Sequence, residues 1–329
     1  MKDKYYERNL DNPIFTQSLL THFIGNYRLG IRELYKTMTM DMPTSPSAHL
    51  GQVIHKIIET QEIPNLDVTI EVPKLQKVKD VLNRHYELTQ NDRLKKDSIL
   101  QACEEVNYLQ SYKSDTRVDK IMKYQLYYSK LIEGTTDTIL DDKQLSLLNP
   151  FLNTWEDSKL VKLYLDQEKE GKVLKEHVMF NKQETAKGKA DRIILKDKEI
   201  QLWDIKTTQK SYEEYIEGRY LQDTYIYKAL VLHQAVFYTY LIMEEFGLSK
   251  SDLKNISPNI LLICLDPILP TYSIVNIEPL LNWHNITWEQ LYKELSNEIF
   301  TCMNKFFKLV KLLKDDKGYL DIVYDYKDE

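Results

Sequence analysis

The central part of the chain carries short apolar runs of the length of β-strands. Residues 190–195 and 200–205 are two short apolar runs, separated by the charged stretch Lys196-Asp197-Lys198-Glu199. This pattern is typical of a β-hairpin with a two-residue loop. Further strands are predicted at 174–181 (LKEHVMFN), 259–267 (NILLICLDP) and 272–277 (YSIVNI).

Helical periodicity lies on both sides of this region. Apolar residues three and four positions apart predict helices at 14–36, 49–61, about 222–246 and 287–313. The segment 222–246 is apolar nearly all round, which indicates a helix buried against a sheet. Between 61 and 172 the composition is rich in Lys, Glu, Gln and Tyr, with heptad-like stretches that predict three to five helices. We expect Ser211 to Tyr220 to form a polar connection.

These elements suggest four parts. They are N-terminal helices with the first core helix (1–60), a helical insertion (61–172), a core (173–280), and a C-terminal helix with an acidic tail (281–329). Strands and helices mixed in this order predict an α/β fold.

Composition narrows the class of protein. The chain has 329 residues, 43% hydrophobic and 29% charged, as expected of a globular protein with a sizeable core. No apolar run approaches the ~18 residues of a membrane span, and MKDKYYERNL lacks a signal-peptide pattern. We therefore expect a cytoplasmic protein without membrane contact. Three scattered cysteines cannot supply a four-cysteine cluster and are interpreted as core residues.

The formal charge of −6 argues against a general polyanion binder. Any nucleic-acid site must therefore be a local basic patch, or must recruit metal ions to meet the phosphates.

The predicted hairpin contains two aspartates and a lysine. If the loop centre lies between Asp197 and Lys198, Asp191 stands directly opposite Asp204, with Cβ atoms about 5 Å apart on one face. Lys206 follows Asp204 by two positions and so shares that face. Two such carboxylates repel unless a divalent cation or a shared proton offsets their charge. The alternative is a surface ladder of ion pairs, which the apolar residues on both sides of each strand disfavour.

Two pairs of polar residues accompany the hairpin on predicted helices. His55 and Glu59 are four residues apart, as are Gln234 and Tyr238, so each pair shares one helix face. A local hydrogen bond is the alternative for the first pair. Gln234 and Tyr238 stand in an apolar helix and need partners, so a buried pair that fixes the helix to the sheet is the alternative there.

The order of these pieces resembles the PD-(D/E)XK nuclease superfamily, in its RecB/RecE-like phage exonuclease branch. The matching stretches are GQVIH with His55, KGKADRI with Asp191, WDIKTT with Asp204 and Lys206, and HQAVFY with Gln234 and Tyr238. The resemblance covers roughly 14–60 and 174–266. Asp204 stands where many members have Glu, and the four cysteines of some RecB-like relatives are missing.

The resemblance implies a restriction-endonuclease-like core, in which a mixed central sheet is flanked by helices (αβββαβ), with a Mg²⁺ or Mn²⁺ site. Asp191, Asp204 and His55 would hold the cation, with the backbone carbonyl of Ile205 as a further ligand. Oxygen ligands suit either metal, and an imidazole shifts the preference toward Mn²⁺. The cation would polarise a phosphate and lower the pKa of a water, and Lys206 would orient that water or stabilise charge on the phosphate.

Further residues have candidate roles in such a site. Glu176 is either a second-metal or water-positioning carboxylate or an edge-strand surface charge, and Glu59 is a weaker candidate of the same kind. By resemblance, Gln234 and Tyr238 contact DNA or support the site. Thr207, Thr208 and Lys210 are candidate phosphate contacts.

The leading functional hypothesis is therefore a metal-dependent exonuclease that acts on double-stranded DNA ends, for phage recombination or repair. A single-strand annealing protein and a homo-oligomer are the candidate partners. One alternative is a structure-specific or CRISPR-adaptation-like endonuclease with the same site. Another is an inactive DNA-binding subunit, which the presence of Asp191, Asp204 and Lys206 disfavours.

Overall fold

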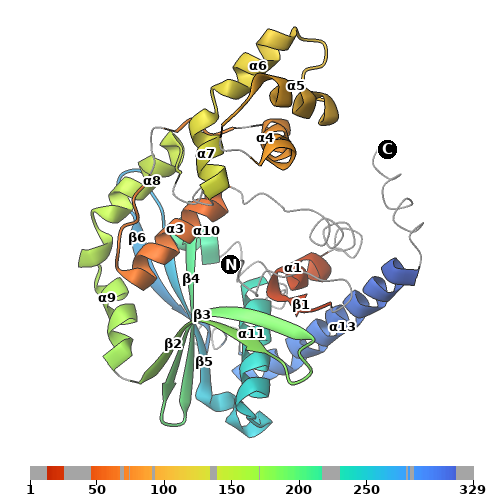
Figure 1. Cartoon of the computed structure of the whole chain (residues 1–329). Coiled ribbons are helices and arrows are strands. Elements are labelled where there is room, and N and C mark those ends of the chain that lie inside the picture. Colours follow the sequence, from red (N-terminus) through yellow and green to blue (C-terminus); the bar gives the residue numbers. More distant parts are fainter. Residues whose placement is uncertain are drawn as a thin grey trace. The chain divides into compact units, whose positions relative to one another are not determined.

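The computed structural model describes residues 13–25, 46–66, 70–73, 75–90, 93–133, 139–169, 171–216, 230–278, 281 and 285–315. The chain divides into two compact units (Figure 1). The first combines Met1–Pro43 with Asn153–Glu329, and the second is Thr44–Leu152. Each unit is described by itself below. Among the described helices, none is long and apolar enough to cross a membrane.

The first unit is built on a mixed six-stranded sheet. Its strands run in the order β1-β3-β4-β5-β6, and β2 pairs with β3. The β1–β3 and β4–β5 pairs are parallel and the other three pairs are antiparallel. The strands are β1 (Phe15–Thr16), β2 (Lys172–Phe180), β3 (Ala186–Lys196), β4 (Glu199–Thr208), β5 (Ile256–Cys264) and β6 (Thr271–Asn276).

Helices cover both faces of this sheet (Figure 1). On one face, α11 (Leu230–Phe246) packs against β2, β3 and β5, and it also contacts α1 (Gln17–Gly25) and α13 (Trp288–Asp315). Their shared core contains an aromatic cluster in which Phe15 contacts Phe23, Phe237 and Phe306. On the other face lies α9 (Lys159–Asp166). The aromatic contacts of α9 with the sheet involve strand residues whose side chains point away from α11, because they alternate along the strands with the residues that face α11.

The α/β class and the sheet flanked by helices are thus as expected, although the boundaries of several elements differ from the predicted ones. The helix predicted from residue 14 begins at Gln17, because Phe15 and Thr16 pair with Ala186 and Lys187 as strand β1. The strand predicted at 259–267 spans Ile256–Cys264. It ends before the turn in which Asp266 accepts hydrogen bonds from two backbone N–H groups.

The connections also differ in part from expectation. The polar connection after β4 contains a short helix, α10 (Tyr212–Ile216), in which Ser211 and Glu214 bond reciprocally as an N-terminal cap. Residues 26–36 and 222–229 of two predicted helices, and the tail from 316, lie outside the described residues. All three cysteines are free and buried, as expected.

The second unit is helical. Its described helices are α3 (Pro46–Thr60), α4 (Gln76–Thr89), α5 (Lys96–Glu105), α6 (Ser114–Met122), α7 (Gln125–Glu133) and α8 (Asp142–Leu152). With α9, six α-helices are found among the described residues between 61 and 172, more than the three to five expected. Apolar residues of α4 to α7 form one core, with Val81, Leu82, Ile99, Ile121 and Tyr128 at its centre.

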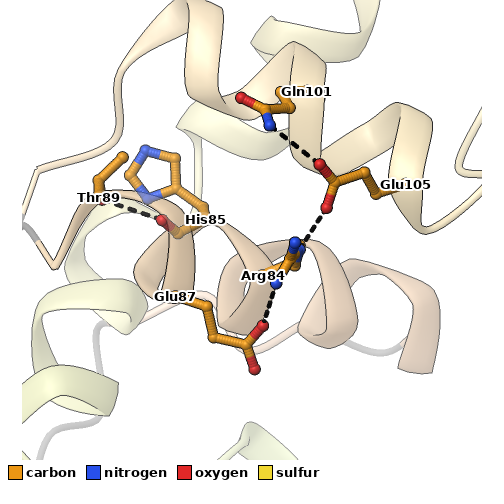
Figure 2. Close-up of polar contacts among 6 residues, drawn as sticks. All are labelled: Arg84, His85, Glu87, Thr89, Gln101 and Glu105. Atoms are coloured by element: carbon orange, nitrogen blue, oxygen red, sulfur yellow. Dashed lines mark hydrogen bonds and ion pairs between the residues drawn. The ribbon is translucent and has the colours of Figure 1, made fainter.

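Polar contacts join α4 to α5 at the surface of this core (Figure 2). Arg84 of α4 lies between Glu87 and Glu105, and the carboxylate of Glu105 also accepts a hydrogen bond from Gln101. Beneath them His85 is fully buried. Its Nδ1 lies 2.7 Å from the Tyr128 hydroxyl, and its Nε2 accepts a hydrogen bond from the Lys95 backbone N–H at 3.1 Å.

Candidate active site

The β3–β4 hairpin has the register predicted from its loop. Lys196 pairs with Glu199, and pairing continues to Arg192 and Trp203. Asp197 and Lys198 form the two-residue turn. In this register Asp191 is the residue opposite Asp204, immediately beyond the last paired residues.

The two strands separate at this point. One edge of β3 pairs with β4 from Arg192 onward and with β1 at Ala186 and Lys187. Between these two stretches, β4 diverges from β3. In the resulting fork the Asp191 carboxylate takes the place of a strand neighbour. Its Oδ2 accepts a hydrogen bond from the Ile205 backbone N–H at 2.7 Å. The fork holds Asp191 against β4 through its side chain.

On the other edge of β3, Asp191 lies opposite Glu176 of β2. The β2–β3 ladder pairs Lys175 with Arg192 and His177 with Ala190, and the intervening pair is missing from it. Glu176 has φ of 49°, a conformation that non-glycine residues rarely adopt. A carboxylate oxygen of Glu176 and one of Asp191 nevertheless lie within 4.8 Å of each other. Glu176, Asp191 and Asp204 therefore stand level on three neighbouring strands.

The strand alternation shifts by one residue at the same place. Gly188 and Ala190 face α11 in the first half of β3, whereas Ile193 does so in the second half. Strict alternation would not place Ala190 and Ile193 on one face. Asp191 lies between them, so its surroundings could not be derived from the period of two alone.

Asp204 is held from two sides. Its Oδ1 accepts a hydrogen bond from Gln234 Nε2 of α11 at 3.0 Å, and its Oδ2 lies 2.7 Å from Lys206 Nζ. Its side chain retains only 15% exposure, against 33% for Lys206. An apolar pocket lies behind this contact, lined by Leu202, Val231, Ala235, Tyr238 and Ile260 among others. Gln234 thus supports the candidate site directly.

The charge of Lys206 is stabilised by its surroundings. Desolvation by itself would lower its pKa, but the negative charges of Asp204 and Asp191 and the hydrogen bond to Asp204 have the larger combined effect. The pKa of Lys206 is therefore raised above its ordinary value. Both aspartates are close enough to act on this ammonium group, which stays protonated at neutral pH.

Tyr238 is one turn further along α11 and packs over Gly188 of β3. A Cβ at residue 188 would lie 2.8 Å from ring carbon Cε1 of Tyr238 and 2.8 Å from Cδ1 of Leu241. Glycine at this position lets α11 approach the sheet closely. Tyr238 is 7% exposed, so in the first unit it serves the contact between helix and sheet.

The candidate phosphate contacts lie at the carboxyl end of β4. Thr207 and Thr208 are partly exposed and Lys210 is exposed. The Thr208 hydroxyl accepts a hydrogen bond from the Lys210 N–H at 3.1 Å, and the Thr208 carbonyl accepts one from Leu265 at 2.6 Å. The turn after β4 is thereby fixed beside the end of β5.

His55 and Glu59 lie one turn apart on α3 of the second unit, both partly buried. Their helix is as expected, and their part in the site stays a prediction. The role of the Ile205 carbonyl as a ligand also stays a prediction. The Ile205 N–H donates to Asp191.

One charged residue of this region was not foreseen. Lys189, two residues before Asp191, forms an ion pair with Glu176. This lysine stands in the stretch KGKAD, but its ion-pair partner depends on the pairing of β2 with β3, which no local pattern specifies.

No protein-family model matches the chain, and no curated protein matches its sequence.

Proposed function

We propose that this protein is a metal-dependent nuclease of the PD-(D/E)XK type, an exonuclease that acts on linear double-stranded DNA. The observation that carries the proposal is the fork between β3 and β4, with Asp191 and Asp204 opposite each other and Lys206 paired with Asp204. The strand–helix order β2-β3-β4-α11-β5 around it is compatible with a restriction-endonuclease-like core.

The donor set fits a hard divalent cation. Asp191 and Glu176 present carboxylate oxygens within 4.8 Å of each other, and Asp204 follows Trp203, the last residue of β4 that pairs with β3. Mg²⁺ and Mn²⁺ prefer such oxygen ligands. In the proposal His55 completes the set with an imidazole, which suits Mn²⁺.

A bound Mg²⁺ or Mn²⁺ would supply Lewis acidity, which lowers the pKa of a water and polarises a phosphate. The chain itself supplies orientation and charge. Lys206 carries a stabilised positive charge that can meet a phosphate oxygen as negative charge grows on it. Gln234 fixes the orientation of the Asp204 carboxylate. Thr207, Thr208 and Lys210 would bind neighbouring phosphates.

The exonuclease mode is tested with two DNA substrates. Purified protein is incubated with Mg²⁺ or Mn²⁺ and either end-labelled linear duplex or covalently closed circular duplex of the same sequence. We expect degradation of the linear DNA alone, with the labelled end giving the polarity. Asp204→Ala and Lys206→Ala should each abolish degradation without loss of fold.

Two results would contradict the proposal in different ways. Cleavage of closed circles would replace the exonuclease with an endonuclease that uses the same site. Full activity in both variants would refute the site itself. A single-stranded tail left by an exonuclease would be a substrate for an annealing protein, the partner class that this function implies.

A further inference from the structure

The residues next to the two aspartates form a cluster on the opposite face of the sheet. Arg192 and Trp203 are the last paired residues of the hairpin, one position before Asp191 and Asp204 are reached in the fork. Both pack on Tyr164 of α9. We call Tyr164, Arg192 and Trp203 the Tyr164 cluster.

Arg192 is a charged residue with no exposed surface. Its Nη1 donates a hydrogen bond to the Tyr164 carbonyl at 2.8 Å, and its Cζ lies 4.1 Å from the centre of the Tyr164 ring. Tyr164 is in the last turn of α9, where carbonyl groups lack partners within the helix and the helix dipole favours a cation. A single residue thus binds the guanidinium through its carbonyl and its ring.

Trp203 completes the cluster from β4. Its ring centre lies 5.6 Å from that of Tyr164 at 74°, an edge-to-face contact. Its Nε1 donates to Gln201 Oε1 at 3.2 Å, which fixes the indole along its own strand. Tyr164 therefore contacts both strands of the hairpin at the point where they separate.

We propose that Tyr164 is a positioning residue for the candidate metal site: it holds Arg192 and Trp203, and through them sets the spacing of Asp191 and Asp204. Arg192 and Asp191 are adjacent in the chain, as are Trp203 and Asp204, so a residue fixed on the α9 side restrains the backbone of its neighbour in the site. This inference rests on the proposed function, and it assigns to α9 a role that its sequence did not indicate.

The test measures the affinity of the full chain for Mn²⁺ by calorimetry, without DNA. Tyr164→Leu removes the ring and should weaken Mn²⁺ binding by roughly 10- to 100-fold, the usual effect of losing a group that orients metal ligands. Tyr164→Phe keeps both the ring and the carbonyl and should bind Mn²⁺ like the wild type.

A second variant covers the case in which Tyr164→Leu does not fold. Arg192→Lys keeps the positive charge but loses the planar group that stacks on Tyr164. It should also weaken Mn²⁺ binding. The variant retains the charge because removing a positively charged side chain near the site would by itself strengthen Mn²⁺ binding.

A matched control separates positioning from general stability. Phe306→Leu opens the core around α13, on the other face of the sheet, and should lower stability without changing the affinity for Mn²⁺. Wild-type affinity in Tyr164→Leu or Arg192→Lys would overturn the positioning role and leave the metal site intact. An equal loss in Phe306→Leu would overturn it too. Failure of the wild type to bind Mn²⁺ would refute the proposed function itself.

Discussion

At the scale of single residues, the candidate site separates two tasks. In the proposed site Asp191 and Asp204 would offer oxygens to a cation, and Lys206 would offer a positive charge to the phosphate. Lys206 Nζ lies 2.7 Å from Asp204 Oδ2. The lysine would therefore compete with a cation for this carboxylate.

Replacing Lys206 with methionine tests this division. Lys206→Met keeps the chain length and removes the charge, so Mn²⁺ should bind at least as tightly as in the wild type. Degradation of linear duplex DNA should nevertheless fall by roughly 100-fold or more, as for loss of one preorganised electrostatic group. Calorimetry and a nuclease assay on the same protein give both numbers. Weakened Mn²⁺ binding with retained cleavage would assign Lys206 to the metal site instead.

At the scale of elements, the hairpin depends on a turn with one strained residue. Asp197 has φ of 50°, whereas Lys198 beside it has no positive φ. Glycine is the residue that adopts a positive φ without steric cost.

Asp197→Gly should therefore raise the free energy of unfolding by about 0.5–1 kcal/mol. Lys198→Gly is the matched control. It relieves no strain and adds freedom to the unfolded chain, so it should lower the free energy of unfolding by a similar amount. Urea titrations of both variants measure the change in the free energy of unfolding and hence its sign. Stabilisation by Lys198→Gly, or none by Asp197→Gly, would contradict the described turn.

The hairpin also shows how far a sequence pattern reaches. Its register follows from the period of two and the loop length, so the opposition of Asp191 and Asp204 was predictable. The fork was not, because it requires β1 to pair with the first half of β3, a contact between residues 15 and 186. The shift in alternation at Asp191 and the ion pair of Glu176 with Lys189 arise from the same long-range pairings.

The positions of the helices followed the apolar pattern well. The contacts that the helices make with the candidate site and its neighbours did not follow from that pattern. The contact of Gln234 with Asp204 fits a polar residue that needs a partner in an apolar helix. Tyr164, by contrast, is one of many tyrosines in a segment with no visible motif. Its contacts with Arg192 and Trp203 depend on the packing of α9 against the sheet, which no local pattern specifies.

At the scale of the whole molecule, the two units have separate cores and should respond differently to acid. In the second unit, burial and then the charge of Lys95 lower the pKa of His85. Its Nε2 accepts a hydrogen bond from the Lys95 N–H, which only the unprotonated nitrogen can do.

The sign of the pH effect follows from this lowered pKa. Above about pH 6.5, the ordinary pKa of histidine, the contribution of neutral His85 is fully present. As the pH falls below that value toward the lowered pKa, the unfolded state binds a proton first and stability is lost. Hydrogen-exchange protection factors of 76–89 and 125–133 should therefore drop between pH 7 and 5, more than those of 256–264. In His85→Gln this difference should disappear, and its persistence would contradict the assignment to His85.

The proposed function itself depends on a cation between the strands of the fork, and cleavage by matched variants tests this most directly. The rate of nucleotide release from end-labelled linear duplex DNA is measured with Mn²⁺ and with chelator, for the wild type and for Asp204→Asn. The proposal predicts release by the wild type only when Mn²⁺ is present, and a loss of roughly 100-fold or more in Asp204→Asn. Release that continues in chelator, or a wild-type rate in Asp204→Asn, would contradict it.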